Sequence, residues 1–362
     1  MAEKQVSLTP EQRALAFAKF TRQYMQVLPA ISTTENGTIS FDLPKARLIN
    51  KIRLLITDTI KVKHATSTEF VPAAMAPFNY INNIRVTANN GFSPYNISGV
   101  GIYLYNLLHN KAKTMEPFHS KTAATVAASR SRTKLGLEAD STGKDNALQI
   151  VVDLPLALND KNPVGLWLAQ TDDTVITVTI NFNDADILNS ALTGFTMTSG
   201  GISVVPMVES FSIPKLREAF PDISMLKLVQ EQNQTIAGAG QIDVKLPTGL
   251  TYRKLIAHIT DAAGAGVADS TLTGNMELIF NQADIPYSVR PLLLSAINQE
   301  HYGVTLPNGV FVFDFASFQG LANYAGSRDL IDTEKITEFW FRFQAAAAGN
   351  VRIVSEMLSK LR

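Results

Sequence analysis

The amino-acid sequence predicts an all-β fold of two tandem sandwiches, preceded by one amphipathic helix. Alternation of apolar and polar residues with a period of two dominates the chain after Pro29. A strand-loop-strand pattern occurs twice, about 200 residues apart. The length of 362 residues exceeds the usual span of one globular core, so two domains are expected.

The first predicted element is the helix, which starts at Thr9-Pro10-Glu11-Gln12. Thr9 provides an N-cap hydroxyl, Pro10 occupies the first helical position, and Gln12 can close a capping box. Apolar residues recur near helical spacing from Leu15 onward, and Pro29 marks the latest end of the helix. Over the first 28 residues, four cations oppose two anions. The helix is therefore expected either to pack its apolar face on a subunit or to lie near an anionic surface.

Strands are predicted over most of the remaining chain. The clearest is Thr174–Phe182, where Ile, Val and Phe alternate with Thr and Asn from Ile176 onward. Ser98–Leu108 fits a helix as well as a strand, and Ser98 as a capping residue favours a short helix. The other predicted strands are Ile49–Thr57, Ile81–Ala88, Leu148–Leu154, Tyr252–Ile259, Met276–Phe280, Val310–Phe315, Thr337–Phe343 and Val351–Val354.

An internal repeat divides the chain into domains. Phe41-Asp42-Leu43 and the strand that ends at Asp58 have a counterpart in Ile242-Asp243-Val244 and the strand that ends at Asp261. We expect residues 1–35 to form the helix and a linker, 36–186 the first sandwich, 187–202 a second linker, and 203–362 the second sandwich with a C-terminal tail. Each sandwich then has the size of an eight-stranded jelly roll with long loops.

The composition indicates assembly. Charged residues make up 18% of the chain, and 32 basic residues balance 32 acidic residues. A folded monomer with so few charges would be poorly solvated, and covering its surface with other subunits removes this problem. The zero net charge also argues against direct binding of nucleic acid. No signal peptide or membrane-spanning stretch is recognisable, so we expect synthesis in the cytoplasm.

Sequence motifs for chemistry are absent. Cysteine does not occur, and the five histidines lack metal-ligand spacing. Gly264–Asp269 approaches a dinucleotide fingerprint but has Asp in place of the third Gly. Asp172-Asp173 and Asn183-Asp184-Ala185-Asp186 suit turns as well as an ion between subunits, so ion binding stays open. We expect no catalytic residue, no cofactor and no metal site, and therefore no enzymatic activity.

Two other function classes were considered. A β-sandwich hydrolase would need clustered acids or a nucleophile with a base, and no local pattern supplies them. A carbohydrate-binding jelly roll, such as a lectin or adhesin, would use exposed aromatic side chains. The aromatic residues available for that role are Tyr95, Tyr105, Trp167, Tyr287 and Trp340.

The chain resembles the double jelly-roll major capsid proteins of tectivirus-type, membrane-containing phages over nearly its whole length. The resemblance rests on the collinear order of segments, each of which is a weak signal alone. In the first half these segments are Leu8–Gln12, Phe41–Asp58, Asn82–Val86, Ser98–Asn110, Leu148–Ala157, Val164–Leu168 and Thr174–Phe182. In the second half they are Phe220–Leu226 and Leu306–Asp314.

This resemblance implies a virion structural protein that is made and assembled in the host cytoplasm. It implies homotrimers that form pseudo-hexagonal tiles of an icosahedral shell over an internal membrane. The implied partners are other copies of the chain, the other capsid, vertex and membrane proteins, and membrane lipid at the N-terminal helix. Residues 1–28 are then expected to act as a membrane-side foot more than as part of either core. The residues expected to face the membrane are Lys4, Arg13, Phe17, Lys19, Phe20, Arg22 and Tyr24.

Overall fold

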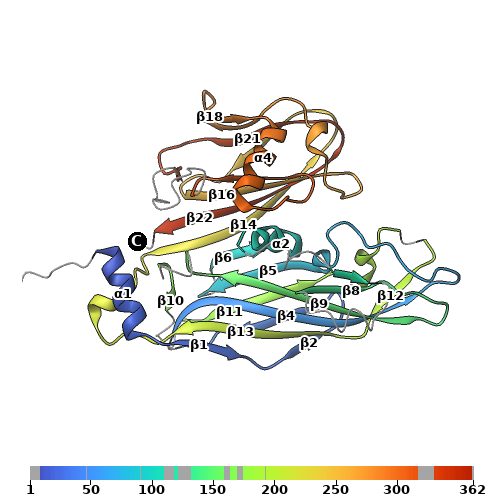
Figure 1. Ribbon diagram of the computed structural model, residues 1–362, viewed down its shortest axis with the longest axis horizontal. Coiled ribbons are helices and arrows are strands. Elements are labelled where there is room, and N and C mark those ends of the chain that lie inside the picture. Colours follow the sequence, from blue (N-terminus) through green and yellow to red (C-terminus); the bar gives the residue numbers. More distant parts are fainter. Residues whose placement is uncertain are drawn as a thin grey trace, which may run out of the picture. The chain divides into compact units, whose positions relative to one another are not determined.

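The computed structural model describes residues 9–45, 47–89, 91–109, 118–120, 132–158, 164–168, 174–191, 193–316 and 330–360. The chain divides into two compact units. Unit 1 contains Met1–Asn106, Thr114–Lys227 and Lys360–Arg362, and unit 2 contains Leu107–Lys113 and Leu228–Ser359. Strands predominate in both units (Figure 1).

The N-terminal helix is shorter than the sequence allowed. Helix α1 spans Pro10–Phe20 and has the predicted capping box: the Gln12 backbone N–H donates to Thr9 Oγ1 at 3.3 Å, and the Thr9 N–H donates to Gln12 Oε1 at 3.0 Å. The possible continuation to Pro29 is wrong. Gln23–Val27 form strand β1, because their backbone pairs antiparallel with β13 (Ile202–Phe211).

Unit 1 contains two sheets, and the first sheet has the strand order β1-β13-β4-β9-β8-β7. Its central strand, β4 (Leu48–Lys63), pairs with β13 on one side and with β9 (Lys144–Pro155) on the other. The remaining strands of this sheet are β8 (Thr133–Gly136), β7 (Phe118–Ser120), β2 (Ile31–Thr33), β10 (Trp167–Leu168) and β12 (Thr196–Ser199).

The second sheet of unit 1 contains β6 (Phe92–Ile97), β5 (Ile81–Ala88), β11 (Ile176–Phe182) and β3 (Thr38–Asp42), in that order. Strand β11 alternates strictly between buried and half-buried residues, as predicted. Helix α2 (Gly99–His109) confirms the helical alternative for this segment, and Ser98 Oγ accepts a hydrogen bond from the Gly101 N–H at 3.0 Å. Short 3-10 helices are η1 (Phe78–Tyr80), η3 (Ala185–Leu188) and η4 (Arg217–Ala219).

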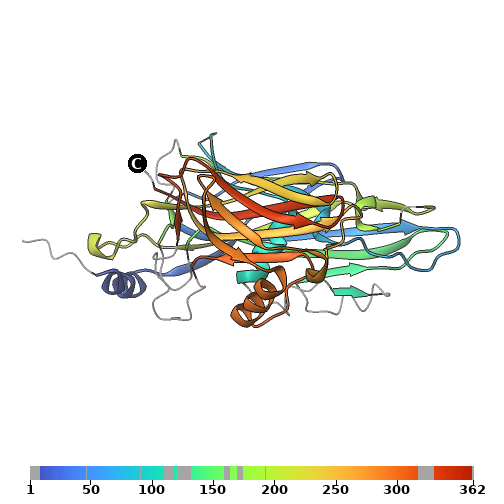
Figure 2. The ribbon, with the colours of Figure 1, turned by 90° about the horizontal axis from the view of Figure 1, so that it is seen from above.

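Unit 2 is a second sandwich. We number its two sheets the third and the fourth, after the two of unit 1. The third sheet has the strand order β19-β16-β22-β14, and the fourth has the order β15-β21-β17-β18. Residues of both sheets form one hydrophobic core, in which Phe339, Phe341 and Phe343 point inward as predicted. Figure 2 shows the yellow to red strands of this unit from another side, with an orange helix beside them.

The elements of unit 2 have the following bounds. The third sheet is built from β14 (Met225–Ile236), β16 (Thr251–Asp261), β19 (Val310–Asp314), β20 (Ile331–Asp332) and β22 (Gly349–Lys360). The fourth sheet is built from β15 (Gly240–Leu246), β17 (Met276–Phe280), β18 (Asp284–Val289) and β21 (Phe339–Ala345). The helices are η5 (Asp269–Thr271) and α4 (Pro291–Tyr302), and α4 was not among the predicted elements.

The division between the units differs from the predicted linker at 187–202. Strand β13 follows that segment and pairs along β4 from Ser203 to Phe211, so it belongs to unit 1. After β13, unit 1 continues to Lys227, and Leu228–Ser359 belong to unit 2. Residues 9–35 are likewise part of unit 1, because β1 and β2 both pair with β13.

Candidate assembly surfaces

Helix α1 lies at one end of the strands of unit 1, beside β1 and β10 (Figure 1). The helix packs against η4. Leu15 and Phe20 on α1 and Leu216 next to η4 are large apolar side chains that remain exposed. Lys19 is exposed as well, and its Nζ lies 5.7 Å from the centroid of the Phe20 ring. The exposed part of this end therefore combines apolar and basic side chains.

Phe17 does not belong to that exposed surface, although the sequence analysis placed it among the membrane-facing residues. Its side chain is 3% exposed and packs in a core cluster with Leu48 and Leu166. The Phe17 ring meets the Phe211 ring edge-on at 5.2 Å. The helix is amphipathic, and Phe17 lies on its inner face.

The other expected membrane-side residues occupy different environments. Arg22 is exposed beside Lys19 and Phe20, whereas Arg13 is half-buried. Tyr24 is half-buried, and the Arg47 guanidinium lies 3.9 Å from the centroid of its ring. Lys4 lies outside the described residues. Lys19, Phe20 and Arg22 are thus the expected residues whose side chains are accessible.

A charge cluster occupies the outer face of the first sheet. Arg53 on β4 donates from Nε to Asp153 Oδ1 on β9 at 2.7 Å, and its Nη1 lies 3.6 Å from Glu209 Oε1 on β13. Arg132 Nη2 lies 3.1 Å from Asp153 Oδ2. Burial opposes ionisation of Asp153, but the hydrogen bond from Arg53 and the charge of Arg132 outweigh it and lower the pKa of this carboxyl.

Unit 2 contains an equivalent cluster on the third sheet. Lys254 Nζ on β16 lies 3.0 Å from Asp314 Oδ2 on β19, and Glu356 on β22 is the residue paired with Lys254 on the other side. Tyr302 donates its hydroxyl to Asp314 at 2.6 Å. Burial, and then the charge of Asp314, raise the pKa of Tyr302, so the phenol stays protonated and remains a donor.

Each unit also fixes a helix to a strand by one buried asparagine. Asn106 on α2 donates from Nδ2 to the Asp153 carbonyl and accepts from the Asp153 N–H, both at 2.7 Å. Asn298 on α4 forms the same pair of bonds with Val312 on β19, at 2.8 and 2.9 Å. These amides satisfy strand backbone groups that lie out of reach of water.

Sequence reasoning missed both clusters and both asparagines. An ion pair between neighbouring strands depends on strand register, which the sequence alone leaves undetermined. One signal was available: Asn106 interrupts an otherwise apolar segment of the predicted helix. A polar residue at such a position requires a buried hydrogen-bond partner.

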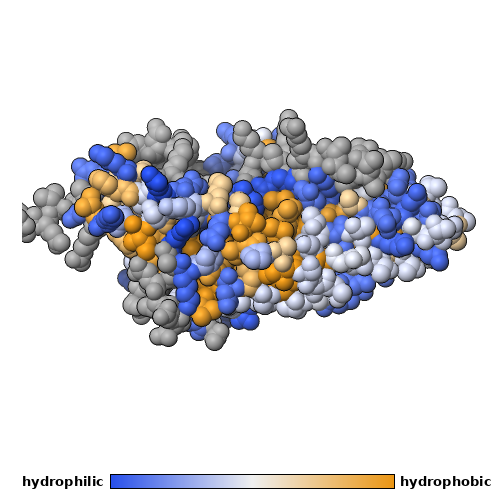
Figure 3. Space-filling view, turned by 90° about the horizontal axis from the view of Figure 1, so that it is seen from below, coloured by the Kyte–Doolittle hydropathy of each residue, from blue (hydrophilic) through white to orange (hydrophobic). Residues whose placement is uncertain are grey.

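Three apolar side chains form a row across the outer face of the first sheet. Leu55, Val151 and Val205 lie side by side on β4, β9 and β13, and each is half-buried. Met25 and Val27 on β1 pair with Glu209 and Met207 on β13, nearer the charge cluster, and are 63% and 61% exposed. Figure 3, the view from below, shows hydrophobic residues gathered in the middle of the side on which β1 and β13 lie.

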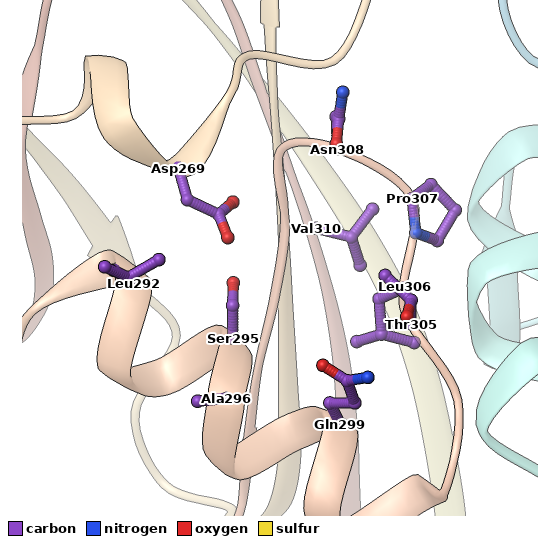
Figure 4. Close-up of a pocket in the computed structure, with 10 residues that line it drawn as sticks. All are labelled: Asp269, Leu292, Ser295, Ala296, Gln299, Thr305, Leu306, Pro307, Asn308 and Val310. Carbon is purple, nitrogen blue, oxygen red and sulfur yellow. The ribbon is translucent and has the colours of Figure 1, made fainter.

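Unit 2 contains two small pockets among its described residues. A pocket of about 190 Å³ lies between η5, α4 and the loop before β19, and Figure 4 shows the polar ends of Asp269 and Ser295 turned toward each other inside it. A pocket of about 300 Å³ is lined mainly by alanines and other small residues around Gly266.

Within the described residues, no group of three or more potential metal ligands occurs. No helix among them is both long and apolar enough to cross a membrane.

The aromatic residues considered for carbohydrate binding do not form an exposed platform. Tyr95 and Tyr105 are fully buried, and Trp167 is 5% exposed. Tyr287 packs against Phe313 and Phe315 of the core. Trp340 is half-buried on the fourth sheet, where Lys245 Nζ lies 5.5 Å from its ring. The carbohydrate-binding alternative therefore lacks support.

Comparison with solved structures decides the fold. A chain of Sulfolobus Turreted Icosahedral Virus matches at a TM-score of 0.66 and 15% identity, over 93% of this chain and 91% of that chain. The major capsid protein of bacteriophage PM2 matches at 0.53 and 12% identity, over 94% and 98% of the two chains. The fold is the double jelly roll.

A third match supports the same assignment. The Faustovirus major capsid protein has a TM-score of 0.60 and 8% identity to this double jelly roll, over 94% of this chain and 90% of that chain. No protein-family model matches the sequence, and no curated protein matches it either. The likeness is therefore one of fold across the whole chain.

Proposed function

We propose that this chain is a viral major capsid protein whose homotrimers form pseudo-hexagonal tiles of an icosahedral shell. The observation that carries the proposal is the double jelly roll, which aligns over more than nine tenths of the chain with major capsid proteins of PM2 and Faustovirus. The alignment also spans nine tenths or more of those proteins. The proposed role is structural, in the virion, after synthesis and assembly in the host cytoplasm.

The surface of the chain supports an assembling protein. The net charge is zero, and Leu55, Val151 and Val205 form an apolar row on the outer face of the first sheet. Subunit interfaces typically have an uncharged, apolar centre with a polar rim. The partners we propose are other copies of the chain together with the capsid, vertex and membrane proteins of the same virion.

The mass of the purified protein in solution tests the proposal. We expect about three times the 39.5 kDa of one chain by light scattering at micromolar concentration. Electron microscopy of the same sample should show hexagonal outlines. A stable monomer would contradict the proposal.

The proposal includes a finer element, which is that the α1 end of unit 1 faces an internal membrane. Its support is the exposed combination of Leu15, Phe20 and Leu216 with the cations Lys19 and Arg22. Apolar side chains insert among lipid headgroups, and nearby cations add attraction to anionic lipid. Phe17 is not part of this contact, because it is buried in unit 1.

A further inference from the structure

The smaller pocket of unit 2 is lined by polar side chains that have no partner. It lies between η5, α4 and the loop before β19, and all of its described lining residues belong to unit 2. The polar residues in the lining are Asp269, Ser295, Gln299, Thr305 and Asn308. Within the described part of the chain, none of these side chains forms a hydrogen bond or an ion pair. Their hydrogen-bonding groups are therefore available to a ligand.

The walls of the pocket are held in place by contacts that lie outside it. Asn298 and Tyr302 bond α4 to β19, and η5 contacts α4. The loop before β19 rests on Gly266, where a Cβ atom would collide with the carbonyl oxygen of Asn308. A ligand thus meets a pocket that is already formed, which lowers the entropy cost of binding.

The charge of the lining selects the charge of the ligand. Among the described residues that line the pocket, Asp269 is the one that carries a charge. Its carboxylate would repel a phosphate or another anion, because no basic side chain in this lining compensates it. Figure 4 shows Asp269 and Ser295 turned toward each other, with Gln299 one turn further along α4. All three side chains can accept hydrogen bonds, so the lining favours a positive ligand with N–H donors.

A metal ion and a sugar fit this lining less well. A metal site needs several ligand groups around one point, and the described residues contain no group of three or more potential metal ligands. Sugar sites commonly use an aromatic side chain, and none of the described lining residues is aromatic. An organic cation remains as the class of ligand.

Apolar side chains in the same lining provide room for an alkyl chain. Leu292, Leu306, Pro307 and Val310 lie beside the polar groups. The volume of about 190 Å³ is smaller than the roughly 300–1,000 Å³ of pockets that enclose a drug-sized ligand. The pocket therefore suits one small group with a charged nitrogen end and a short apolar stem.

We propose that this pocket binds an organic cation with a short alkyl stem, which is an ammonium or guanidinium group of the kind that lysine and arginine side chains carry. The nitrogen head donates to Asp269, Ser295 and Gln299, and the stem packs against Leu292 and Val310. The cation is either a free amine or a basic side chain of a neighbouring chain, and the experiment below distinguishes these sources.

Saturation-transfer nuclear magnetic resonance with n-butylammonium tests the site in the purified protein. The natural protein should transfer saturation to the butyl protons. Asp269→Asn should weaken binding about threefold to tenfold, because it removes a charge-assisted hydrogen bond at a partly exposed site. The neutral n-butanol should bind more weakly than n-butylammonium, and added salt should reduce this difference.

Two further variants locate the binding. Ala296→Phe fills the pocket from an exposed position on α4 and should abolish the transfer. Asp284→Asn removes a carboxylate from an exposed position on β18 outside the pocket, and it should bind as the natural protein does. Far-ultraviolet circular dichroism should be unchanged in every variant. Equal binding by the natural protein and all three variants would overturn the proposal. If Ala296→Phe fails to fold, Asp269→Asn compared with Asp284→Asn still decides.

Comparison of the purified protein with assembled particles identifies the source of the cation. A free amine leaves the pocket accessible, so transfer persists in particles. A basic side chain of a neighbouring chain excludes n-butylammonium once the two chains are in contact, and Asp269→Asn then weakens assembly. Both outcomes support the pocket. No transfer in the purified protein, together with normal assembly of Asp269→Asn, would overturn the proposal and leave the capsid role standing.

Discussion

Asn106 and Asn298 show how single residues fix the helices of this fold. Each amide replaces two hydrogen bonds that a neighbouring strand would otherwise supply to β9 or β19. Both side chains are buried, so water cannot take over their role. Loss of such a group leaves a strand N–H and a carbonyl without partners, and each costs roughly 1–3 kcal/mol when buried.

For Asn298→Leu we expect the free energy of unfolding to fall by about 2–4 kcal/mol. The leucine has a similar size but can neither donate to the Val312 carbonyl nor accept from its N–H. Urea unfolding at fixed protein concentration measures the change. Gln299→Leu on the neighbouring exposed position is the control and should change stability by less than about 0.5 kcal/mol. Equal stability of the two variants would show that the amide bonds contribute little.

His258 leads to a prediction about pH. It is 1% exposed on β16, and neither ring nitrogen has a hydrogen-bond partner among the described residues. Burial, and then the charge of Arg352, lower its pKa from 6.5 to about 3. The folded protein therefore holds a neutral imidazole at pH values where the unfolded chain binds a proton. The free energy of unfolding is therefore highest above about pH 6.5, and it falls as the pH decreases toward 3 because the unfolded chain gains a proton.

Between pH 6 and pH 4, this single group should lower the free energy of unfolding by about 1 kcal/mol per pH unit. His258→Leu has no proton to bind, so its stability should depend on pH less steeply by that amount. Urea titrations at several pH values compare the two proteins. Parallel curves for the natural protein and the variant would contradict the assignment.

At the scale of elements, most strands were predictable, whereas the end of α1 and the presence of α4 were not. Strands such as β11 and β21 have one buried and one outer face, so their period-two pattern is visible in the sequence. Strand β1 reads Gln-Tyr-Met-Gln-Val and continues the helical spacing of α1, and only its pairing with β13 makes it a strand. Local patterns do not contain such long-range pairing.

The same limit explains what was missed in the candidate surfaces. The accessible residues Lys19, Phe20 and Arg22 followed from composition and helical spacing. The burial of Phe17 depends on Phe211, almost 200 positions away, and the ion pair of Arg53 with Asp153 depends on the register of β4 and β9. Three-dimensional coordinates were necessary for both.

Helix α1 leads to a prediction that separates its two faces. Phe17→Ala removes a buried ring from the cluster with Leu48 and Leu166, so it should destabilise the protein by about 3 kcal/mol. Phe20→Ala removes a ring that is 47% exposed and should cost less than about 1 kcal/mol. Thermal unfolding of the two variants measures the difference. If both cost the same, α1 does not have the inner and outer faces described.

At the scale of the whole molecule, the proposed membrane contact can be tested with intact protein. Lys19→Glu combined with Arg22→Glu reverses two exposed cations at the α1 end. Each cation near an anionic membrane contributes about 1 kcal/mol, so binding to vesicles that contain anionic lipid should weaken at least tenfold. The effect should shrink as salt concentration rises.

The matched control reverses two exposed cations at the other end of β4, Lys61→Glu with Lys63→Glu. It changes the net charge equally but should leave binding as in the natural protein. Co-sedimentation with vesicles provides the measurement. Equal loss in both double variants would show that only total charge matters, and no loss in either would contradict a membrane-side α1.

The length of β4 limits how the protein can vary. This strand has 16 residues, and at about 3.3 Å per residue it spans about 50 Å, from the α1 end to the opposite end of unit 1. An insertion of one residue would turn all later side chains to the other face, and an insertion of two would need matching additions in β9 and β13. In a shell built from such chains, the thickness of the wall would thus resist gradual change. Differences between related proteins should accumulate in the loops that join the strands.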